Sequence, residues 1–345
     1  MKEGVFQSAT ALHLESGQQL SQFSLSYTTY GQLNADQSNV IWVVHALTGD
    51  SNAAQWWSGL VAKNAFFAHS DYFIICANLL GSAYGSTNAL SIDPQTGSPY
   101  FYSFPQLSTR DHAHSLDRLR DHLKINQIHT LIGGSLGGQI AIEMAILLGN
   151  RVQHAVIVAA TAKTSPWVIG FNEAQRMAIA ADSTWGERTP EAGKKGMEAA
   201  RAIAMLSYRN PTDLNVKQKE TEEKLDGFLA SSYLRYQGTK LAQRFHAFSY
   251  WSLTKSMDSH DVGRQRGGIE LALKRISAKV LVVGVGSDLL FLPEESRLLS
   301  TLVTHGMYRE IQSPVGHDAF LIEFGQLVTF IKQFYQTATV SNYGR

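Results

Sequence analysis

The chain has 345 residues, of which 44% are hydrophobic and 17% charged, a balance typical of a globular protein and incompatible with intrinsic disorder. Thirty Lys and Arg against twenty-nine Asp and Glu leave a formal net charge of +1, which excludes a general electrostatic attraction to nucleic acid or to an anionic membrane. Because this length exceeds that of a typical domain, we expect one large domain with an insertion, or two domains.

Two features of the sequence bear on its cellular location. The first residues lack the apolar segment of a signal peptide, and no later stretch is long and uncharged enough to span a bilayer. We therefore expect a cytoplasmic protein that does not engage a membrane. The single cysteine, Cys76, lies inside the apolar run 72–78, which predicts a buried structural thiol and leaves no intramolecular disulfide.

The predicted elements begin with residues 11–14 and 23–28, which alternate polar and apolar residues around a turn at 16–17. This pattern predicts an antiparallel hairpin at one edge of a sheet. Short apolar runs rich in β-branched residues follow, which is typical of parallel strands buried on both faces. Helical patterns separate them, so the chain is predicted to form an α/β sheet. The runs are 40–45, 72–77, 129–134, 154–159 and 279–284, with a further strand at 308–312.

From about Ser165 to His260 no comparable strand is found, and the sequence is typical of helices, notably at 191–206 and 216–229. The strand pattern then resumes at Lys279. This arrangement predicts a helical lid inserted between strands of one sheet. We expect residues 1–164 and 261–345 to form the core domain and residues 165–260 to form the lid domain.

The sharpest local motif is G-x-S-x-G at 133–137, which follows a predicted strand and precedes a predicted helix at 139–148. A strand-to-helix turn of this kind leaves no room for side chains beside the serine, so glycines flank it. It also exposes the hydroxyl of Ser135 above a helix N-terminus, where developing negative charge is stabilised. The alternative is a glycine-rich turn with an N-capping serine.

A serine nucleophile needs a base and an acid that orients the base, and in the α/β-hydrolase fold these follow in the chain order Ser, Asp, His. Asp288 comes directly after the strand at 279–284, and His317 comes after the strand at 308–312. The sequence thus predicts a triad of Ser135, Asp288 and His317. A loop aspartate on the surface and a solvated or core histidine are the alternatives for the last two.

A tetrahedral intermediate also needs backbone N–H donors, which this fold takes from the residue after the nucleophile and from the loop after an early strand. These positions predict an oxyanion hole formed by Leu136 and by Leu47 in the loop 45–50. A plain β-to-α turn is the alternative interpretation of that loop.

Other patterns point away from metal and nucleotide chemistry. Leu116, Leu119 and Leu123 set the buried face of one predicted helix, so we expect its histidines on the solvated side rather than in a metal site. Gly284 and Gly286 lack the third glycine of a dinucleotide fingerprint, and no Walker motif is found. The residues of the rejected metal cluster are Asp111, His112, His114 and His122.

With these residues in hand, the sequence closely resembles the homoserine O-acetyltransferase family, whose members are α/β-hydrolase-fold proteins of methionine biosynthesis. The resemblance spans nearly the whole chain. It is carried, in order, by 45–51 with Trp56 and Trp57, 77–82, 133–138, 171–176, 232–238, 257–264 and 316–320.

The resemblance implies a ping-pong reaction in which Ser135 takes an acetyl group from acetyl-CoA and the hydroxyl of homoserine then collects it. It implies that Arg176 holds the substrate carboxylate, that Asp318 holds the amino group, and that Tyr233 lines the acceptor pocket. The alternatives are a lid salt bridge for Arg176, a helix N-cap for Asp318 and a buried aromatic for Tyr233. A homodimer acting on small molecules is also implied, with acetyl-CoA as co-substrate, no bound cofactor and no metal.

The chain departs from the family pattern at a few positions. Leu136 stands where methionine is usual, His246 where aspartate is expected and Phe248 where asparagine is expected. Residues 60–67 lack a glycine-rich segment, and Asn88 stands where glycine followed by proline is usual. A related transferase that uses succinyl-CoA or serine, a serine esterase of the same fold, and a non-catalytic binding protein are the alternative functions.

Overall fold

The computed structural model describes residues 1–340, with side chains described through residue 337. In this part of the chain eight strands form one sheet in the order β1-β4-β6-β5-β7-β8-β9-β10. In this order the strands from β6 to β10 pair in parallel, whereas β4 is antiparallel to both of its neighbours, β1 and β6. The predicted mostly parallel α/β sheet is therefore confirmed. Their bounds are β1 Lys2–Ser8, β4 Phe23–Tyr30, β5 Val40–Val44, β6 Phe73–Ala77, β7 Ile128–Gly134, β8 Val152–Val158, β9 Lys279–Val285 and β10 Gly306–Ile311.

The sheet is covered by helices on both faces, which explains why its central strands are continuous apolar runs. In β5, Val40, Trp42 and Val44 pack into the hydrophobic cluster on one face, and Ile41 and Val43 pack into the cluster on the other. Helices α3, α4, α10 and α11 contribute to the first cluster and α1, α2 and α12 to the second. These helices are α1 Ala53–Trp56, α2 Ser58–Val61, α3 Thr109–His122, α4 Leu136–Leu148, α10 Ile269–Leu273, α11 Pro293–Leu302 and α12 Phe324–Val340, with single 3-10 turns η1 Phe101–Ser103, η2 Gly149–Arg151 and η3 His317–Leu321.

The predicted hairpin between residues 11–14 and 23–28 is wrong. The short strands β2 (Leu12–His13) and β3 (Gln19–Leu20) pair with each other in a separate sheet, because the turn after Leu14 closes within a few residues. Strand β4 pairs instead with β1, whose register sets Phe6 opposite Leu25. Strand β1 was not predicted, since a half-exposed edge strand carries little apolar signal.

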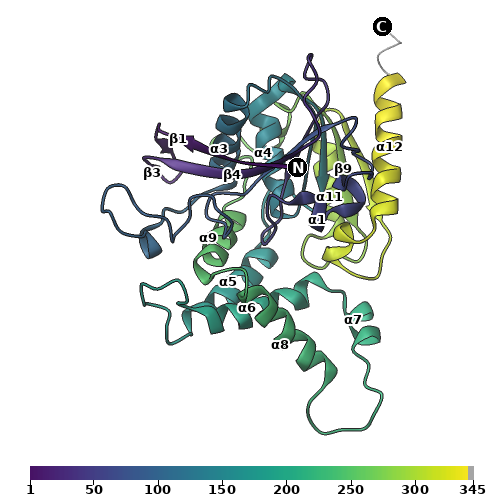
Figure 1. Cartoon of the computed structure of the whole chain (residues 1–345). Helices are drawn as coiled ribbons and strands as arrows, with labels where there is room; N and C mark the ends of the chain where they lie inside the picture. The colour runs from purple at the N-terminus through teal and green to yellow at the C-terminus, as the bar shows by residue number, and fades with distance from the viewer. Residues whose placement is uncertain (341–345) are drawn as a thin grey trace.

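Helices α5 to α9 follow β8 and precede β9, and Figure 1 shows them together below the sheet. The helix predicted at 191–206 is found as α6. The prediction of a helix at 216–229 is wrong, because α7 ends at Lys217 and α8 begins at Leu229. Residues 218–228 form a connection in which Leu225 is 99% exposed, so its charged segment has no apolar surface to pack against. The bounds are α5 Pro166–Ala180, α6 Lys194–Tyr208, α7 Pro211–Lys217, α8 Leu229–Ala242 and α9 Ala247–Asp258.

One histidine of α3 departs from its predicted solvated position. His114 and His122 are exposed, but His112 is fully buried with its Nε2 atom 3.1 Å from Ser256 Oγ of α9. Burial lowers the pKa of His112 to about 3. The error arose because α9 covers a face of α3 that the leucine spacing alone assigns to solvent. Asp111 completes a capping box with Ser108 at the start of this helix.

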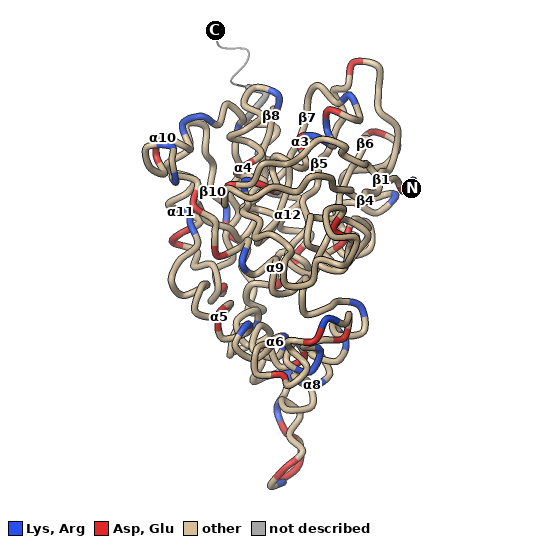
Figure 2. Tube along the Cα trace, turned by 90° about the vertical axis from the view of Figure 1, so that its left-hand side faces the viewer, with Lys and Arg blue, Asp and Glu red and all other residues tan. Residues whose placement is uncertain are grey.

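Charged residues of both signs are scattered over the sheet and over the helices below it (Figure 2). Among residues 1–337, no group of three or more His, Cys, Asp or Glu side chains is placed to hold a metal ion. None of the described helices is both long enough and apolar enough to cross a membrane. Cys76 is fully buried in β6 as predicted, and burial raises the pKa of its thiol well above the ordinary value.

Candidate active site

Ser135 occupies the single position between the end of β7 and the start of α4. Its backbone angles are φ +56° and ψ −128°, a conformation that a residue with a side chain rarely adopts and that is found at functional sites. The turn is tight because backbone packs on backbone around it. A Cβ on Gly133 would lie 2.2 Å from the carbonyl oxygen of Gly137, and a Cβ on Gly137 would lie 2.2 Å from that of Val44.

Replacing Gly137 by alanine should therefore destabilise the fold by about 2 kcal/mol or more, because the added methyl group meets a rigid strand carbonyl rather than a flexible side chain. Thermal unfolding of the purified variant measures this loss. The matched control is Gly170→Ala in α5, where an added Cβ meets nothing within 4 Å and helix propensity should raise stability by up to about 1 kcal/mol. Equal effects at the two positions would contradict the tight-turn explanation.

The structure brings Ser135, His317 and Asp288 together from three loops that follow β7, β10 and β9. His317 Nε2 lies 3.0 Å from Ser135 Oγ, and His317 Nδ1 lies 2.7 Å from Asp288 Oδ2. All three side chains are buried, with exposures of 6% for Ser135, 3% for His317 and 2% for Asp288. This continuous relay has the geometry by which a histidine removes the proton of a serine hydroxyl.

Backbone groups fix the carboxylate of Asp288. Its Oδ1 atom accepts hydrogen bonds from the N–H groups of Leu290 at 2.7 Å and Phe291 at 3.0 Å, which leaves Oδ2 for the imidazole. Because a carboxylate oxygen only accepts, Nδ1 of His317 must carry a proton, and Nε2 is then free to accept the proton of Ser135.

The pKa of His317 is set by opposing effects. Burial by itself lowers it, but the charge of Asp288 and the hydrogen bond to Asp288, with a contribution from Asp318, outweigh burial and raise it above the ordinary 6.5. Only the neutral imidazole accepts a proton. We therefore expect kcat/KM to fall on the acid side with a midpoint above pH 6.5, measured as a pH profile of the purified enzyme. A midpoint at pH 6 or below would contradict this assignment.

The two residues predicted for the oxyanion hole lie in α4 and in the loop after β5. Leu136 is the first residue of α4, so its N–H has no acceptor within the helix. Leu47 lies in the loop after β5, and His45 anchors this loop. Nε2 of His45 accepts a hydrogen bond from the N–H of Leu79 at 3.0 Å, so Nδ1 carries the proton and donates to the carbonyl of Ala46 at 2.8 Å. Burial lowers the pKa of His45, consistent with this neutral form. Leu136 is thus next to Ser135 in the chain, and the start of the loop that holds Leu47 packs against α4, since a Cβ on Gly137 would lie 2.8 Å from the carbonyl oxygen of His45.

Arg176 lies on α5, 1% exposed, and is anchored by two carboxylates. Its Nη2 atom lies 2.5 Å from Asp258 Oδ2, and both Nε and Nη2 donate to Glu173 Oε2 at 3.0 and 2.6 Å. Among the described residues, the buried Nη1 atom of Arg176 has no hydrogen-bond partner. The lid salt bridge considered from the sequence is therefore present. Its two carboxylates use Nε and Nη2 of the guanidinium and leave Nη1 without a hydrogen bond inside residues 1–337.

The other two predicted substrate residues differ in position. Asp318 follows His317 in η3 and forms an ion pair with Arg209, with 3.4 Å between Oδ2 and Nη2. The N-cap residue of η3 is Gly316, so Asp318 is not the N-cap considered from the sequence. Tyr233 lies partly buried on α8, and within residues 1–337 no hydrogen bond or ring contact joins it to the triad.

Sequence reasoning gave no role to Asp258, although it lies in the quoted segment 257–264. Its carboxylate accepts from Asn172 Nδ2 at 2.7 Å as well as from Arg176. Tyr208, whose ring centroid lies 5.6 Å from that of His317, was also missed. The motif Asp258-Ser259-His260 within the quoted segment was the available signal for the first, and the sequence offers none for the second.

The fold and the buried Ser-His-Asp relay define the class of α/β-hydrolase-fold enzymes, and residues 39–324 match the sequence model of the family described as alpha/beta hydrolase fold. A homoserine O-acetyltransferase of Cyclobacterium marinum is 59% identical over 97% of this chain and 95% of its own length. One of Thermus thermophilus is 40% identical over 96% of this chain and 90% of its own length. The chain belongs to the homoserine O-acetyltransferase family.

The crystal structure of a homoserine O-acetyltransferase from Bacillus anthracis is similar in fold, with a TM-score of 0.90, 22% sequence identity, and coverage of 98% of this chain and 97% of that one. At this identity the likeness concerns the fold alone.

Proposed function

We propose that this chain transfers an acetyl group from acetyl-CoA to the hydroxyl of L-homoserine through an acyl-serine intermediate on Ser135, a reaction of methionine biosynthesis. The observation that carries the proposal is the relay in which His317 Nε2 lies 3.0 Å from Ser135 Oγ while Asp288 holds Nδ1 at 2.7 Å. Membership of the homoserine O-acetyltransferase family supports the choice of donor and acceptor.

In the first half of the proposed reaction, the oxygen of Ser135 bonds to the thioester carbonyl carbon as its proton passes to His317. The backbone N–H groups of Leu47 and Leu136 stabilise the negative oxygen of the tetrahedral intermediate. The carbon–sulfur bond then breaks, His317 returns its proton to the sulfur, and coenzyme A leaves as the free thiol.

In the second half, the homoserine hydroxyl gives its proton to His317 and its oxygen bonds to the acetyl carbon. The bond to Ser135 breaks, and Ser135 recovers a proton from His317. The unpartnered Nη1 of Arg176 is suited to a carboxylate, and Asp318 is suited to an ammonium group. We assign these two residues to homoserine as proposals, with Tyr233 as a further residue of the acceptor pocket.

The test is a comparison of two donors with two acceptors in the purified enzyme. Thiol release should be rapid with acetyl-CoA plus homoserine and slower with succinyl-CoA or with serine. Faster transfer from succinyl-CoA or to serine would replace the proposed substrates by those of a related transferase. No thiol release from a folded sample with any pair would reject the transferase function.

A serine esterase of the same fold is the second candidate function, because acyl transfer and hydrolysis share every group up to the acyl-enzyme. Replacing Arg176 by lysine keeps a positive charge beside Asp258 but removes the fork that binds a carboxylate. If the proposal holds, this variant should form the acetyl-enzyme from p-nitrophenyl acetate at the wild-type rate but transfer it to homoserine about tenfold more slowly or worse. Fast hydrolysis, unaffected by either homoserine or the substitution, would favour the esterase.

We also propose that residues 165–260 act as a lid over a core formed by residues 1–164 and 261–345, and that the enzyme is a cytoplasmic homodimer without a bound cofactor. The position of α5 to α9 between β8 and β9 supports the lid. The family resemblance supports the dimer, which sedimentation of the full chain tests directly.

A further inference from the structure

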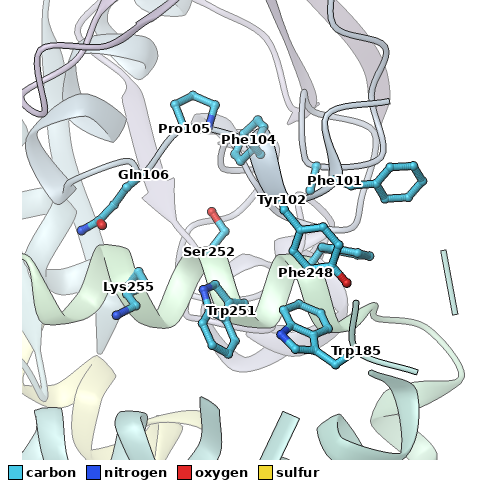
Figure 3. Close-up of a pocket in the computed structure, with 11 residues that line it drawn as sticks. Phe101, Tyr102, Phe104, Pro105, Gln106, Trp185, Phe248, Trp251, Ser252 and Lys255 are labelled. Carbon is cyan, nitrogen blue, oxygen red and sulfur yellow. The ribbon is translucent and has the colours of Figure 1, made fainter. Parts of the chain in front are cut away.

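An aromatic cavity of about 200 Å³ lies where the segment 89–106, which follows β6, meets α9 and Trp185. Figure 3 shows Phe104, Pro105 and Gln106 on one side and Trp251 and Lys255 of α9 on the other. The aromatic side chains that line the cavity pack against one another. The ring of Trp185 lies 5.0 Å from that of Phe248, 5.1 Å from Tyr102 and 5.2 Å from Trp251 between centroids.

Two polar groups of this cavity make neither a hydrogen bond nor an ion pair among the described residues. The Oγ atom of Ser252 is buried without a hydrogen bond, and in Figure 3 its oxygen points from α9 toward the wall formed by Phe104. Lys255, one turn further along α9, makes no ion pair within residues 1–337, although its charge acts on the carboxylates of Glu173 and Asp258. A buried hydroxyl without a hydrogen bond and a lysine without an ion pair, both lining one cavity, suit a ligand that brings an acceptor and a negative charge.

We propose that this cavity, called here the aromatic cavity, binds the purine nucleotide end of the acyl-CoA donor. The inference rests on the proposed function and specifies where its donor is held. A flat heterocycle stacks on aromatic side chains. Gln106 and Ser252 provide hydrogen-bonding groups for the edge of a purine, and Lys255 provides the charge that attracts a phosphate.

The segment 244–248, which leads into α9, contacts both the loop of the candidate oxyanion hole and the aromatic cavity. Arg244 donates from Nη1 to the carbonyl of Thr48 at 2.9 Å, directly beside Leu47. Phe248 follows Arg244 by four residues, so their Cα atoms are at most about 14 Å apart.

A second cavity of about 270 Å³ occupies this stretch and is lined by Lys194, Arg244 and His246, among others. A donor that reaches from Ser135 past Arg244 would pass two basic side chains before its purine enters the aromatic cavity. This order matches the thioester, diphosphate and purine of an acyl-CoA.

Phe248 is one of the positions where the chain departs from the family pattern, which leads us to expect asparagine there. Its ring forms part of the aromatic wall and is 4% exposed. The aromatic cavity is thus expected to bind a purine more tightly in this chain than in relatives with asparagine at that position.

The kinetic test compares acetyl-CoA with S-acetylpantetheine, a donor that carries the same thioester but no nucleotide. In Lys255→Ala the KM for acetyl-CoA should rise on the order of tenfold, while kcat and the KM for S-acetylpantetheine stay at wild-type values. The control Lys195→Ala removes an exposed lid lysine outside the cavity and should change neither KM. Equal changes for both donors, or no change for either, would overturn the proposal.

A binding test with the full chain separates this proposal from the proposed function. Adenosine 3′,5′-bisphosphate should quench the fluorescence of Trp185 and Trp251 in the wild type, with affinity about tenfold weaker in Lys255→Ala and unchanged in Lys195→Ala. Absence of quenching in the wild type, or equal affinity in Lys255→Ala, would overturn the aromatic cavity as a nucleotide site. Lys255-dependent quenching without any acetyl transfer would support the cavity and reject the transferase function instead.

Discussion

Replacing Ser135 by alanine should lower kcat/KM for acetyl transfer by about 10⁴-fold or more, because no other group can form the acyl-enzyme. The substitution removes one oxygen and keeps the Cβ atom, so the strained turn between β7 and α4 is retained. Mass spectrometry after mixing with acetyl-CoA alone should show one added acetyl group in the wild type and none in the variant.

The matched control for this variant is Ser300→Ala. Ser300 is also buried, but its hydroxyl donates only to the carbonyl of Arg297 within α11, so activity should stay at the wild-type level. An acetylated Ser135→Ala protein, or one that keeps more than a tenth of the wild-type rate, would show that the nucleophile lies elsewhere.

Replacing Asp288 by asparagine should lower kcat by about 10⁴-fold with little loss of stability. Its Oδ1 atom already accepts from the N–H groups of Leu290 and Phe291, and only the amide oxygen of an asparagine can take over this position. The amide nitrogen is then turned toward His317 Nδ1, which must accept a hydrogen bond, and the ring proton moves to Nε2. In that tautomer the imidazole has no lone pair for the hydroxyl of Ser135.

Steady-state kinetics measure the loss, and Asp71→Asn is the control, since Asp71 is exposed before β6 and far along the chain from the triad. Its activity should be that of the wild type. Retention of substantial activity in Asp288→Asn with an unchanged pH profile would contradict the tautomer argument.

Much of the fold was predictable because the central strands are buried on both faces. A run such as Val40–Val44 has to be apolar at every position when helices cover the sheet above and below, and this produces a strong signal in the sequence. Ser135 and Asp288 followed from the same signal, since they come shortly after β7 and β9, whereas His317 follows β10, a partly exposed strand at the edge of the sheet.

The edge of the sheet and the surface of the lid were harder to predict. Strand β1 buries only part of one face, so its sequence resembles a loop, and the segment 218–228 is as charged as a surface helix but lacks a packing partner. The burial of His112 depends on α9, which is more than a hundred residues further along the chain. The aromatic cavity likewise joins the segment 89–106 to Trp185 and α9, and no local pattern links them.

The triad side chains all come from loops at the edge of the sheet, whereas Arg176 and its partner Asp258 come from helices inserted between β8 and β9. The Ser-His-Asp relay is therefore a property of the scaffold, and, on our assignments of Arg176 and of the aromatic cavity, the binding of the acceptor and of the donor nucleotide is a property of the insertion. Exchange of those helices between relatives offers a route to new substrate specificity that leaves the three triad residues in place.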